Sequence, residues 1–369
     1  MKETNPNNFP ELLVNEPQKY ISNYYESIYP KMGGRVFDML ALSPASLIIP
    51  KIPRGNKMLK QKINMLLISP PGSAKTSLAE EFEKITYHPL FSEQISAAAL
   101  AFKINQMDKM SLIISDVAVA FSNDELVKLL EQILGDEGVI SRINMNNVGE
   151  YEGGELRKKK EAIAYLSGTP ENITKDIISW GILSRTSPLL IVHSESEHDE
   201  ILEGVNKEIG MDFQGDKKYI PSYYYSLWQI QDGRHETIKP IESYVISEKI
   251  KKDAIEFFKP LAKPYFLRWR VNAVRELEEM YRFIVNSAFL NIYNRKIIDN
   301  KLVVEEQDFE VAKKLISREI ETKDFIMRCL SAVNLERLKT TKEIQNWTAK
   351  RGIKNPMVES IMKGLSGAK

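Results

Sequence analysis

Cysteine, histidine and long apolar runs are scarce in this chain of 369 residues. The single cysteine, Cys329, excludes an internal disulfide and a cysteine-based zinc cluster. The four histidines show no spacing typical of metal ligands. No apolar run approaches the ~20 residues of a membrane helix, and the first residues lack the apolar core of a secretory signal. We therefore expect a cytoplasmic protein without a membrane partner.

The chain also lacks an excess of charge of either sign. Lysine and arginine number 51 and aspartate and glutamate 50, which gives a formal net charge of +1. A nucleic-acid-binding surface would therefore have to be a local patch. Hydrophobic residues make up 43% of the chain and charged residues 27%, as in an ordinary folded protein, and the length favours two or three domains.

A phosphate-binding pattern is present in the segment Ile63–Leu78, which reads INMLLISPPGSAKTSL. An apolar run fits a buried strand, and a helical pattern follows the Lys-Thr pair. In such a loop, backbone N–H groups and a helix N-terminus surround a polyphosphate, the lysine reaches the outer phosphates and the threonine holds Mg²⁺. The alternative is a proline turn before a surface lysine. We predict a nucleotide site formed by Pro71, Gly72, Ser73, Ala74, Lys75, Thr76 and Ser77.

Two residues of this loop depart from the usual G-x-x-x-x-G-K-[ST] pattern. Ser69 and Ala74 stand where that pattern has glycine. We expect Ala74 to have helical φ and ψ angles, which a Cβ atom permits. Gly72 remains available for a close approach of the backbone to a ligand. The sequence offers no reason for Ser69.

Strand-like and helix-like segments alternate from residue 63 to about 200, which predicts a parallel α/β sheet. Helices return from 245 to 320, whereas 205–240 is rich in aromatic residues and shows no clear periodicity. The expected strands are 64–68, 111–115, 162–166 and 189–192, and the clearest helices are 36–42 and 273–293. We divide the chain into an N-terminal helical lead-in (1–60), an α/β core (61–204), a linker and helical lid (205–320) and a C-terminal domain (321–369).

An aspartate ends the second expected core strand, Ser111–Asp116. An aspartate beside a phosphate loop can hold Mg²⁺ through water, and the alternative is a cap at the end of the strand. Hydrolytic versions usually follow it with a glutamate that orients the attacking water, but here Val117 follows. We expect the next acids, Asp124 and Glu125, to begin a helix. The sequence therefore does not predict fast hydrolysis.

Three further segments carry candidate catalytic groups. Ser167 or Thr169, at the end of a strand, would touch the γ-phosphate or the attacking water, unless the segment is a plain strand exit. Arg185 would reach a neighbour's nucleotide and stabilise transition-state charge, unless it is a solvated surface residue. Arg275, near the start of a lid helix, would sense the γ-phosphate, unless it is an exposed helix residue that pairs with Glu278 or Glu279.

Two basic segments are candidates for DNA binding. The run Arg157, Lys158, Lys159 and Lys160 lies in an expected hairpin that would contact phosphates without reading sequence. The segment 322–369 has ten basic and four acidic residues, and its pattern predicts a helix-turn-helix. Its first helix is capped at Thr340 or the next residue, Gly352 makes the turn, and Pro356 suits the second helix. Lys350 and Arg351 would contact DNA. The alternatives are a solvated charge run and a protein-docking helix pair.

Taken in order, these segments resemble the AAA+ motor of the MCM replicative helicase family. Glu26–Tyr29 looks like the family's S-I-Y segment, which implies that Ile28 and Tyr29 line the adenine pocket. Ala74-Lys75 is similar to the family's phosphate loop, and Ser96–Leu100 to its S-A-A-x-L. Ile182–Arg185 looks like its L-L-S-R finger and Val274–Glu278 like its lid pattern x-R-x-L-E. Arg185 would then act in trans, Arg275 would be the second sensor, and Thr169 would replace the first sensor's Asn.

The resemblance implies an AAA+ P-loop NTPase core with a parallel sheet, an α-helical lid and a C-terminal winged-helix or helix-turn-helix-like domain. It implies ATP and Mg²⁺ as cofactors, DNA as partner and a hexameric ring. A DNA-dependent ATPase, helicase or replication initiator of a virus, plasmid or integrated element follows, with archaeal hosts as the first expectation. The alternatives are an ATP-dependent DNA-binding regulator that hydrolyses poorly and a protein-remodelling ATPase.

Overall fold

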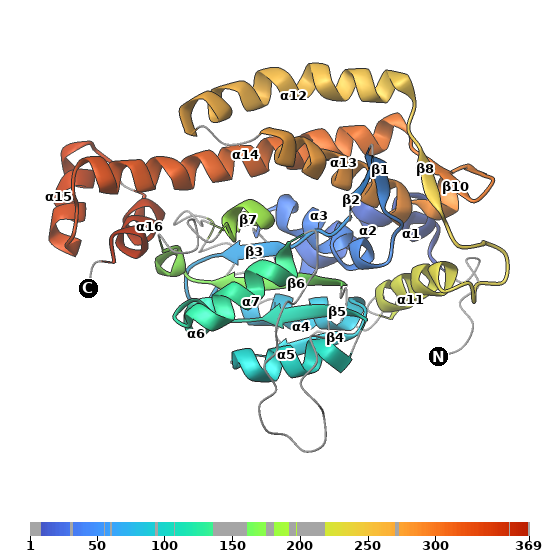
Figure 1. Cartoon of the computed structure of the whole chain (residues 1–369), viewed down its shortest axis with the longest axis horizontal. Coiled ribbons are helices and arrows are strands. Elements are labelled where there is room, and N and C mark those ends of the chain that lie inside the picture. Colours follow the sequence, from blue (N-terminus) through green and yellow to red (C-terminus); the bar gives the residue numbers. More distant parts are fainter. Residues whose placement is uncertain are drawn as a thin grey trace.

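The computed structural model describes residues 9–29, 32–54, 56–59, 61–92, 95–106, 108–135, 161–174, 181–191, 197, 218–269, 273–353 and 355–367. Its centre is a sheet of five strands in the order β4-β5-β6-β3-β7, and every neighbouring pair is parallel (Figure 1). The expected α/β class with a parallel sheet is confirmed. The strands are β3 (Met65–Ile68), β4 (Pro89–Ser92), β5 (Lys109–Ile114), β6 (Glu161–Gly168) and β7 (Ser187–Leu190).

The sheet is covered on both faces, which is why its strands read as continuous apolar runs. Met65 and Leu67 of β3 belong to one buried cluster, and Leu66 and Ile68 belong to the other, because successive side chains of a strand point to opposite faces. The core helices are α4 (Lys75–Ile85), α5 (Ala97–Gln106), α6 (Val117–Phe121) and α7 (Asp124–Leu134). The sequence analysis missed β4, a half-exposed edge strand that begins at a proline.

The N-terminal lead-in is mainly helical and packs into the first cluster. The expected short apolar helix is confirmed as α3 (Gly34–Leu42), seven of whose residues are buried. It follows α1 (Glu11–Asn15) and α2 (Pro17–Ile28). A 3-10 turn, η2 (Pro44–Leu47), and a hairpin of β1 (Ile52–Arg54) and β2 (Lys57–Leu59) lead into the sheet.

The aromatic stretch contains a helix that the sequence analysis did not predict, α11 (Tyr219–Gln231). The expectation of no periodicity in 205–240 is wrong for this part. Its buried residues recur at helical spacing: Ile220, Tyr223, Tyr224, Leu227 and Ile230. The Tyr224 hydroxyl donates to the Ala41 carbonyl of α3, and Tyr223 donates to Leu290. The helix therefore ties the lead-in to the lid.

The lid consists of α12 (Glu248–Trp269), α13 (Ala273–Leu290) and the first part of α14 (Glu306–Leu335), which lie above the sheet in Figure 1. A small sheet, ordered β8-β10-β9, joins them through β8 (Ser243–Val245), β9 (Ile297–Ile298) and β10 (Lys301–Val303), after the turn η5 (Ile292–Asn294). The helix predicted at 273–293 is confirmed as α13. The buried face of its first turns is not apolar: Val274 is 40% exposed, whereas Glu276 and Glu279 are buried.

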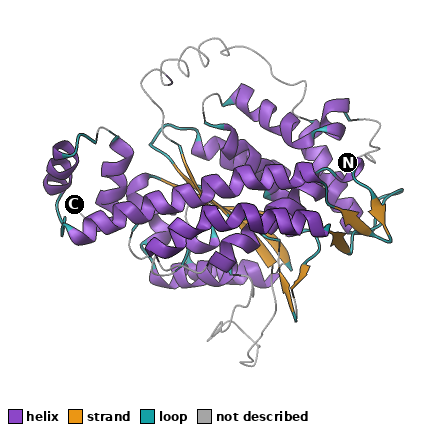
Figure 2. Ribbon diagram, turned by 90° about the horizontal axis from the view of Figure 1, so that it is seen from above, coloured by secondary structure: helices purple, strands orange, loops and turns teal. Residues whose placement is uncertain are grey.

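The C-terminal helix pair, α15 (Thr341–Lys350) and α16 (Pro356–Ser366), has the predicted local structure. The Thr340 side chain caps α15, Gly352 has φ +64°, and Pro356 occupies the first turn of α16. The helix before the pair, α14, runs without a break across the expected domain division at 320/321. Seen from above, α14 extends along the lid toward the C-terminal end (Figure 2). Within the described part of 336–367, no strand forms a wing.

None of the described helices has both the length and the apolar character that crossing a lipid bilayer requires.

Candidate nucleotide site

The loop between β3 and α4 has two residues with left-handed backbone angles. Gly72 has φ +81°, as a glycine readily does, and Ala74 has φ 54° and ψ 22°. The expectation that Ala74 has ordinary helical angles is therefore wrong. A left-handed conformation costs a residue with a Cβ roughly 1–2 kcal/mol. The Ala at this position is strained where the usual glycine would not be.

Ser69 has a structural role that the sequence did not reveal. Its side chain is fully buried, and its backbone N–H donates to Gly168 at the end of β6 (3.1 Å). The Ser73 hydroxyl lies 2.5 Å from the Ser69 hydroxyl and 2.6 Å from the Pro70 carbonyl. These bonds fix the start of the loop to its last turn and to the neighbouring strand.

The N-terminus of α4 leaves backbone N–H groups without a side-chain cap. The first N–H that bonds within the helix is that of Leu78, to Ala74. The N–H groups before Leu78 therefore have no partner within the helix. Helices α7 and α16 are capped by Asn123 and Asn355, whereas α3 and α11, like α4, have no side-chain cap. An uncapped helix start after a glycine-containing loop fits a phosphate group.

Lys75 lies over the loop that would surround the phosphates. Its Nζ donates to the carbonyl oxygens of Ser69 (2.8 Å) and Pro70 (2.9 Å). Burial lowers the pKa of Lys75, and the nearby Asp116 carboxylate opposes this. Thr76, the expected Mg²⁺ ligand, is exposed, and Pro71, Ser73 and Ser77 also line the loop or the first turn of α4.

Asp116 lies at the same edge of the sheet as the loop. Leu166 pairs with Ile114 of β5 and with Leu66 of β3, so Asp116, Gly168 and Ile68 are level with one another. One Asp116 oxygen accepts from the Ala118 N–H (2.9 Å) and caps α6. The capping alternative is thus observed, and the carboxylate, exposed at this edge, keeps a second oxygen for a metal-bound water. The Mg²⁺ role stays a prediction.

Val117 is a buried core residue. It is fully buried, and a Cβ atom added to Gly168 would lie 2.6 Å from its Cγ2. The position where hydrolytic relatives of the motif carry a glutamate is therefore packed under β6. Asp124 and Glu125 form the first turn of α7, as expected, behind the Asn123 cap.

Thr169 follows β6, the strand between the loop strand and the Asp116 strand. Ser167, its alternative, is fully buried and donates to the Ser115 carbonyl (2.7 Å), so it is a link between strands. Thr169 is half-buried and caps the short turn η3 (Pro170–Asn172). The Asn172 Oδ1 accepts from the Thr169 N–H (2.7 Å) and hydroxyl (3.1 Å). Asn172 was missed because the usual capping box has Glu or Gln, not Asn, three residues after the Thr.

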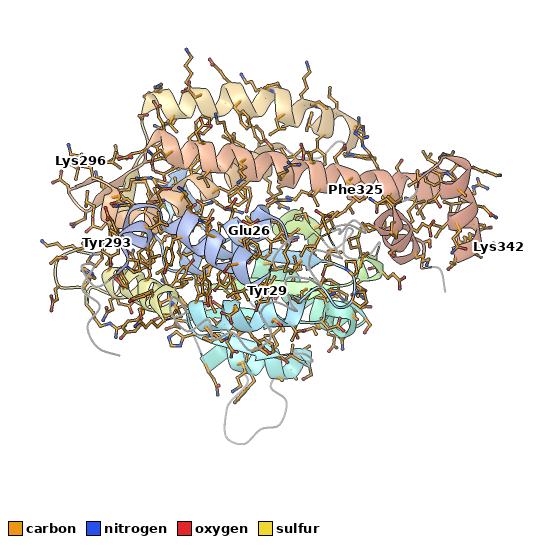
Figure 3. All side chains as sticks on the ribbon, turned by 180° about the vertical axis from the view of Figure 1, so that it is seen from behind. Glu26, Tyr29, Tyr293, Lys296, Phe325 and Lys342 are labelled. Carbon is orange, nitrogen blue, oxygen red and sulfur yellow. The ribbon has the colours of Figure 1, made fainter. Side chains whose placement is uncertain are left out.

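Tyr29 reaches the first turn of α4 from the end of α2. Burial raises the pKa of its phenol, Glu81 and Glu80 raise it further, and an interaction with the Ser77 side chain lowers it. These neighbours place the ring beside the phosphate-loop helix, and Figure 3 shows Tyr29 beside the core of the molecule. Ile28 is also half-buried. The location agrees with a base-contacting role, which stays a prediction.

Arg185 and Arg275 lie together at the opposite edge of the sheet. Arg185 ends the turn η4 (Leu183–Arg185) just before β7, and its guanidinium pairs with Glu131 (3.1 Å) and donates to Gly181. Arg275 donates to the Ser184 hydroxyl (2.5 Å), not to an acid of its own helix. Strand register puts Ile191, not Arg185, level with Ser69. At ~3.3 Å per residue, Arg185 is on the order of 15–20 Å from its own loop.

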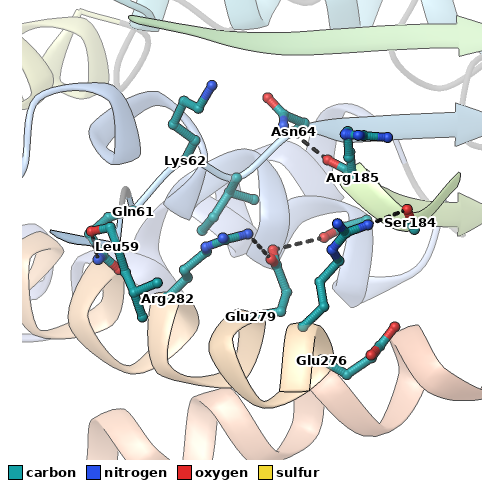
Figure 4. Close-up of polar contacts among 12 residues, drawn as sticks. Leu59, Gln61, Lys62, Asn64, Ser184, Arg185, Glu276, Glu279 and Arg282 are labelled. Atoms are coloured by element: carbon teal, nitrogen blue, oxygen red, sulfur yellow. Dashed lines mark hydrogen bonds and ion pairs between the residues drawn. The ribbon is translucent and has the colours of Figure 1, made fainter. Parts of the chain in front are cut away.

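A polar network surrounds these arginines. Lys62 donates to the carbonyls of Ile133 (2.8 Å) and Gly135 (2.9 Å), which end α7, and the Asn64 amide donates to the Arg185 carbonyl (3.0 Å). Figure 4 shows Lys62 and Asn64 beside Arg185, with Glu279 and Arg282 of α13 below them. The segment before β3 thus holds the end of α7 and the turn that carries Arg185.

The DNA-binding candidates are only partly described. Residues 157–160 lie outside the described ranges. Lys350 is exposed, and Arg351 pairs with Glu336 (2.9 Å) and lies over the Trp347 ring. The second helix, α16, packs on α14 and on η3, so its position argues against a helix that reads a DNA groove. The exposed helix of the pair is α15, whose Lys342 points away from the body of the molecule in Figure 3.

The described residues contain no cluster of three or more histidine, cysteine and acidic side chains that would hold a metal ion. His88 and His235 are described, and His193 and His198 fall outside the described ranges. A phosphate-loop Mg²⁺ site does not need such a cluster, because the phosphates and water supply most of its ligands.

No protein-family model matches this chain, and no curated protein is significantly similar to it. The likeness to the AAA+ motor therefore rests on the motifs of the chain and on the positions of their residues.

Proposed function

We propose that this chain is a Mg²⁺-dependent ATPase that acts on DNA as an assembly of several copies. The observation that carries the proposal is the uncapped start of α4, behind a central parallel strand and under Lys75. Phosphate oxygens would replace the two carbonyl oxygens as the partners of the Lys75 ammonium group. Bound Mg-ATP would supply the phosphoryl group and the metal that polarises it.

Each residue at the carboxyl ends of the parallel strands then has one role. Lys75 and the N–H groups of α4 bind the outer phosphates, and Thr76 and Asp116 orient the metal. The Thr169 hydroxyl, which lies between the phosphate loop and Asp116, would contact the γ-phosphate. Ile28 and Tyr29 cover the base. This assignment uses only side chains that the fold brings to one end of α4.

The two arginines support the need for a second copy. Arg185 and Arg275 are joined through Ser184 at the far edge of the sheet, too far from their own loop to touch its ligand. A neighbouring copy that presents this edge to the loop would place both positive charges beside the phosphates, where they stabilise transition-state charge. A ring of identical copies, as in a hexamer, repeats this contact at every site.

The DNA part of the proposal is supported by charge alone. The segment 322–369 has a basic excess, and Lys350 is exposed on α15. Binding to phosphates would weaken steeply with salt. A protein-remodelling ATPase would show no such affinity, so a salt titration with duplex and single-stranded DNA separates the two.

The test is a complementation of two inactive variants. Lys75→Ala removes the phosphate lysine and should weaken ATP binding at least about tenfold, since a hydrogen bond to a charged group contributes about 1.5–3 kcal/mol. Arg185→Ala should bind ATP normally but lose DNA-stimulated turnover. A mixture of the two should regain activity, because a Lys75→Ala copy can present its intact Arg185 to an intact loop.

Arg318→Ala, at an exposed arginine paired with Glu321, is the matched control and should behave as wild type. Full activity of Arg185→Ala alone, or no recovery on mixing, would contradict the role in trans. Failure of the wild-type protein to bind ATP would contradict the nucleotide site itself.

A second function is favoured by the burial of Val117. Without a glutamate beside Asp116, the site would bind ATP and turn it over slowly, and the protein would act as an ATP-dependent DNA-binding regulator. Under this function ATP raises DNA affinity and assembly, while the bound ATP remains intact over many minutes. Rapid release of phosphate with DNA present would exclude it.

A further inference from the structure

The C-terminal helix α16 approaches the core most closely at Gly364. A Cβ atom at this position would lie 2.4 Å from the Glu171 carbonyl oxygen and 2.8 Å from that of Ile173. Both distances are shorter than any real contact, and both partners are backbone atoms of η3 or the residue after it. A glycine inside a helix is otherwise unfavourable, so the contact is a specific reason for it. The apolar residues Ile361 and Leu365 of α16 are buried on either side.

The turn that Gly364 contacts is continuous with the nucleotide site. Asn172 of η3 holds both the N–H and the hydroxyl of Thr169. A Cβ atom on Gly168 would lie 2.7 Å from the Asn172 Oδ1, so there is no space between this carboxamide and the end of β6. The Gly168 carbonyl in turn accepts from Ser69, the first residue of the phosphate loop.

We propose that Gly364 is a positioning residue for the nucleotide site, and that the seating of α16 on η3 sets where Thr169 meets the γ-phosphate. The inference rests on the proposed function and extends it to the C-terminal helix pair. Interiors this closely packed transmit small shifts instead of absorbing them. A displacement of η3 therefore moves Thr169 more than Lys75 and α4, because only Thr169 is bonded directly to η3.

The discriminating measurement is the affinity for ADP against that for a non-hydrolysable ATP analogue. Gly364→Ala should leave the ADP dissociation constant within about twofold and weaken the ATP analogue on the order of tenfold, a usual size for coupling between sites. ADP serves as the internal control for an intact loop. A helix that merely packs would not change the ratio of the two affinities.

Lys363→Ala is the matched control on the same helix, at a neighbouring residue of similar exposure. Alanine forms helix better than glycine, so without the backbone contact Gly364→Ala would stabilise α16. A stabilised Gly364→Ala protein with an unchanged ratio of affinities would overturn the inference.

Asn172→Ala tests the link between α16 and Thr169. It removes the acceptor that holds Thr169, so it should lower the affinity for the ATP analogue relative to the affinity for ADP. The double variant should lose little more than the more severe single variant, because both changes act on one turn. Additive losses would show two independent effects and would also overturn the inference.

Should Gly364→Ala not fold, amide hydrogen exchange of the wild-type protein decides the question. The ATP analogue should slow exchange of the α16 amides, and ADP should not. Equal exchange with both nucleotides would contradict the connection. Failure of the wild-type protein to bind either nucleotide would instead remove the proposed function.

Discussion

At the carboxyl edge of the central sheet, the chain turns through small residues and a strained Ala74, and α4 begins without a cap. At the amino ends of the strands, by contrast, side chains satisfy the carbonyl groups at the end of a helix and in a turn. Lys62 and Asn64 hold the end of α7 and the turn before β7. Behind them, α13 and α14 bury an ionic cluster, which we define as Glu276, Glu279, Arg282, Glu319 and Lys323.

This contrast separates the residues that stabilise the protein from those that we propose bind its ligand. Charges of the ionic cluster are out of water and depend on one another, so they are costly to break. Lys75 and Asp116, at the carboxyl ends of the strands, reach solvent, so they can exchange their present contacts for a ligand. The same type of residue should therefore respond differently to substitution at the two edges.

The largest expected difference is between two lysines. Lys323 is buried and lies 2.6 Å from Glu319 and 3.9 Å from Glu276, so Lys323→Met leaves two buried carboxylates without their cation. We expect a loss of about 3–5 kcal/mol in the free energy of unfolding. Lys75→Met should cost about 1 kcal/mol or less, since only bonds to loop carbonyls are lost, yet remove nucleotide binding. Urea unfolding measures the loss of stability in both variants. Equal losses would contradict the difference between the two ends of the sheet.

A smaller effect is expected from pH. Burial raises the pKa of Glu279 to about 7, against the opposing charge of Arg282, with Glu319 raising it and Lys323 lowering it. Because the folded-state pKa lies above the unfolded value, the stabilisation is complete below about pH 4.5 and is lost as pH rises through 7. In the wild-type protein the free energy of unfolding should therefore fall by about 1–3 kcal/mol between pH 5 and 8, and Glu279→Gln should remove this fall.

The check for Glu279 is the slope of unfolding free energy against pH, with exposed Glu321→Gln as control. A wild-type slope that persists in Glu279→Gln would assign the pH dependence to another group.

The smallest expected effect is at Ala74. Ala74→Gly relieves the left-handed strain and should stabilise the protein by about 0.5–1 kcal/mol after the entropy cost of glycine. The same substitution at exposed Ala349 in α15 should destabilise by about 1 kcal/mol. Unfolding in urea measures the change in stability of both variants, and its sign should differ between them. A loss in both variants would mean that Ala74 is not strained.

Local signals made much of the fold predictable. The strand, loop and helix around Lys75 were expected from a short pattern, and the Thr340 cap and Gly352 turn placed α15 and α16 correctly. Each of these depends on residues close together in the sequence, where caps and turns act. The strands 161–168 and 109–114 were also expected, with ends displaced by one or two residues.

What the sequence did not predict depends on distant partners. Glu276 and Glu279 are buried because α14 supplies Lys323, and no periodicity within α13 indicates this. The reason for Gly364 lies in a turn in another part of the chain. The left-handed angles of Ala74 follow from how the loop closes between β3 and α4, which the residue type alone does not specify.

The thirty residues of α14 make it about 45 Å long at 1.5 Å per residue. One end lies in the lid against α13, and the other carries the C-terminal pair. A rigid rod of this length acts as a lever: a tilt of about 5° at the lid would displace its far end by about 4 Å. Any movement of the lid would thus be amplified at α15, the most exposed basic helix of the pair.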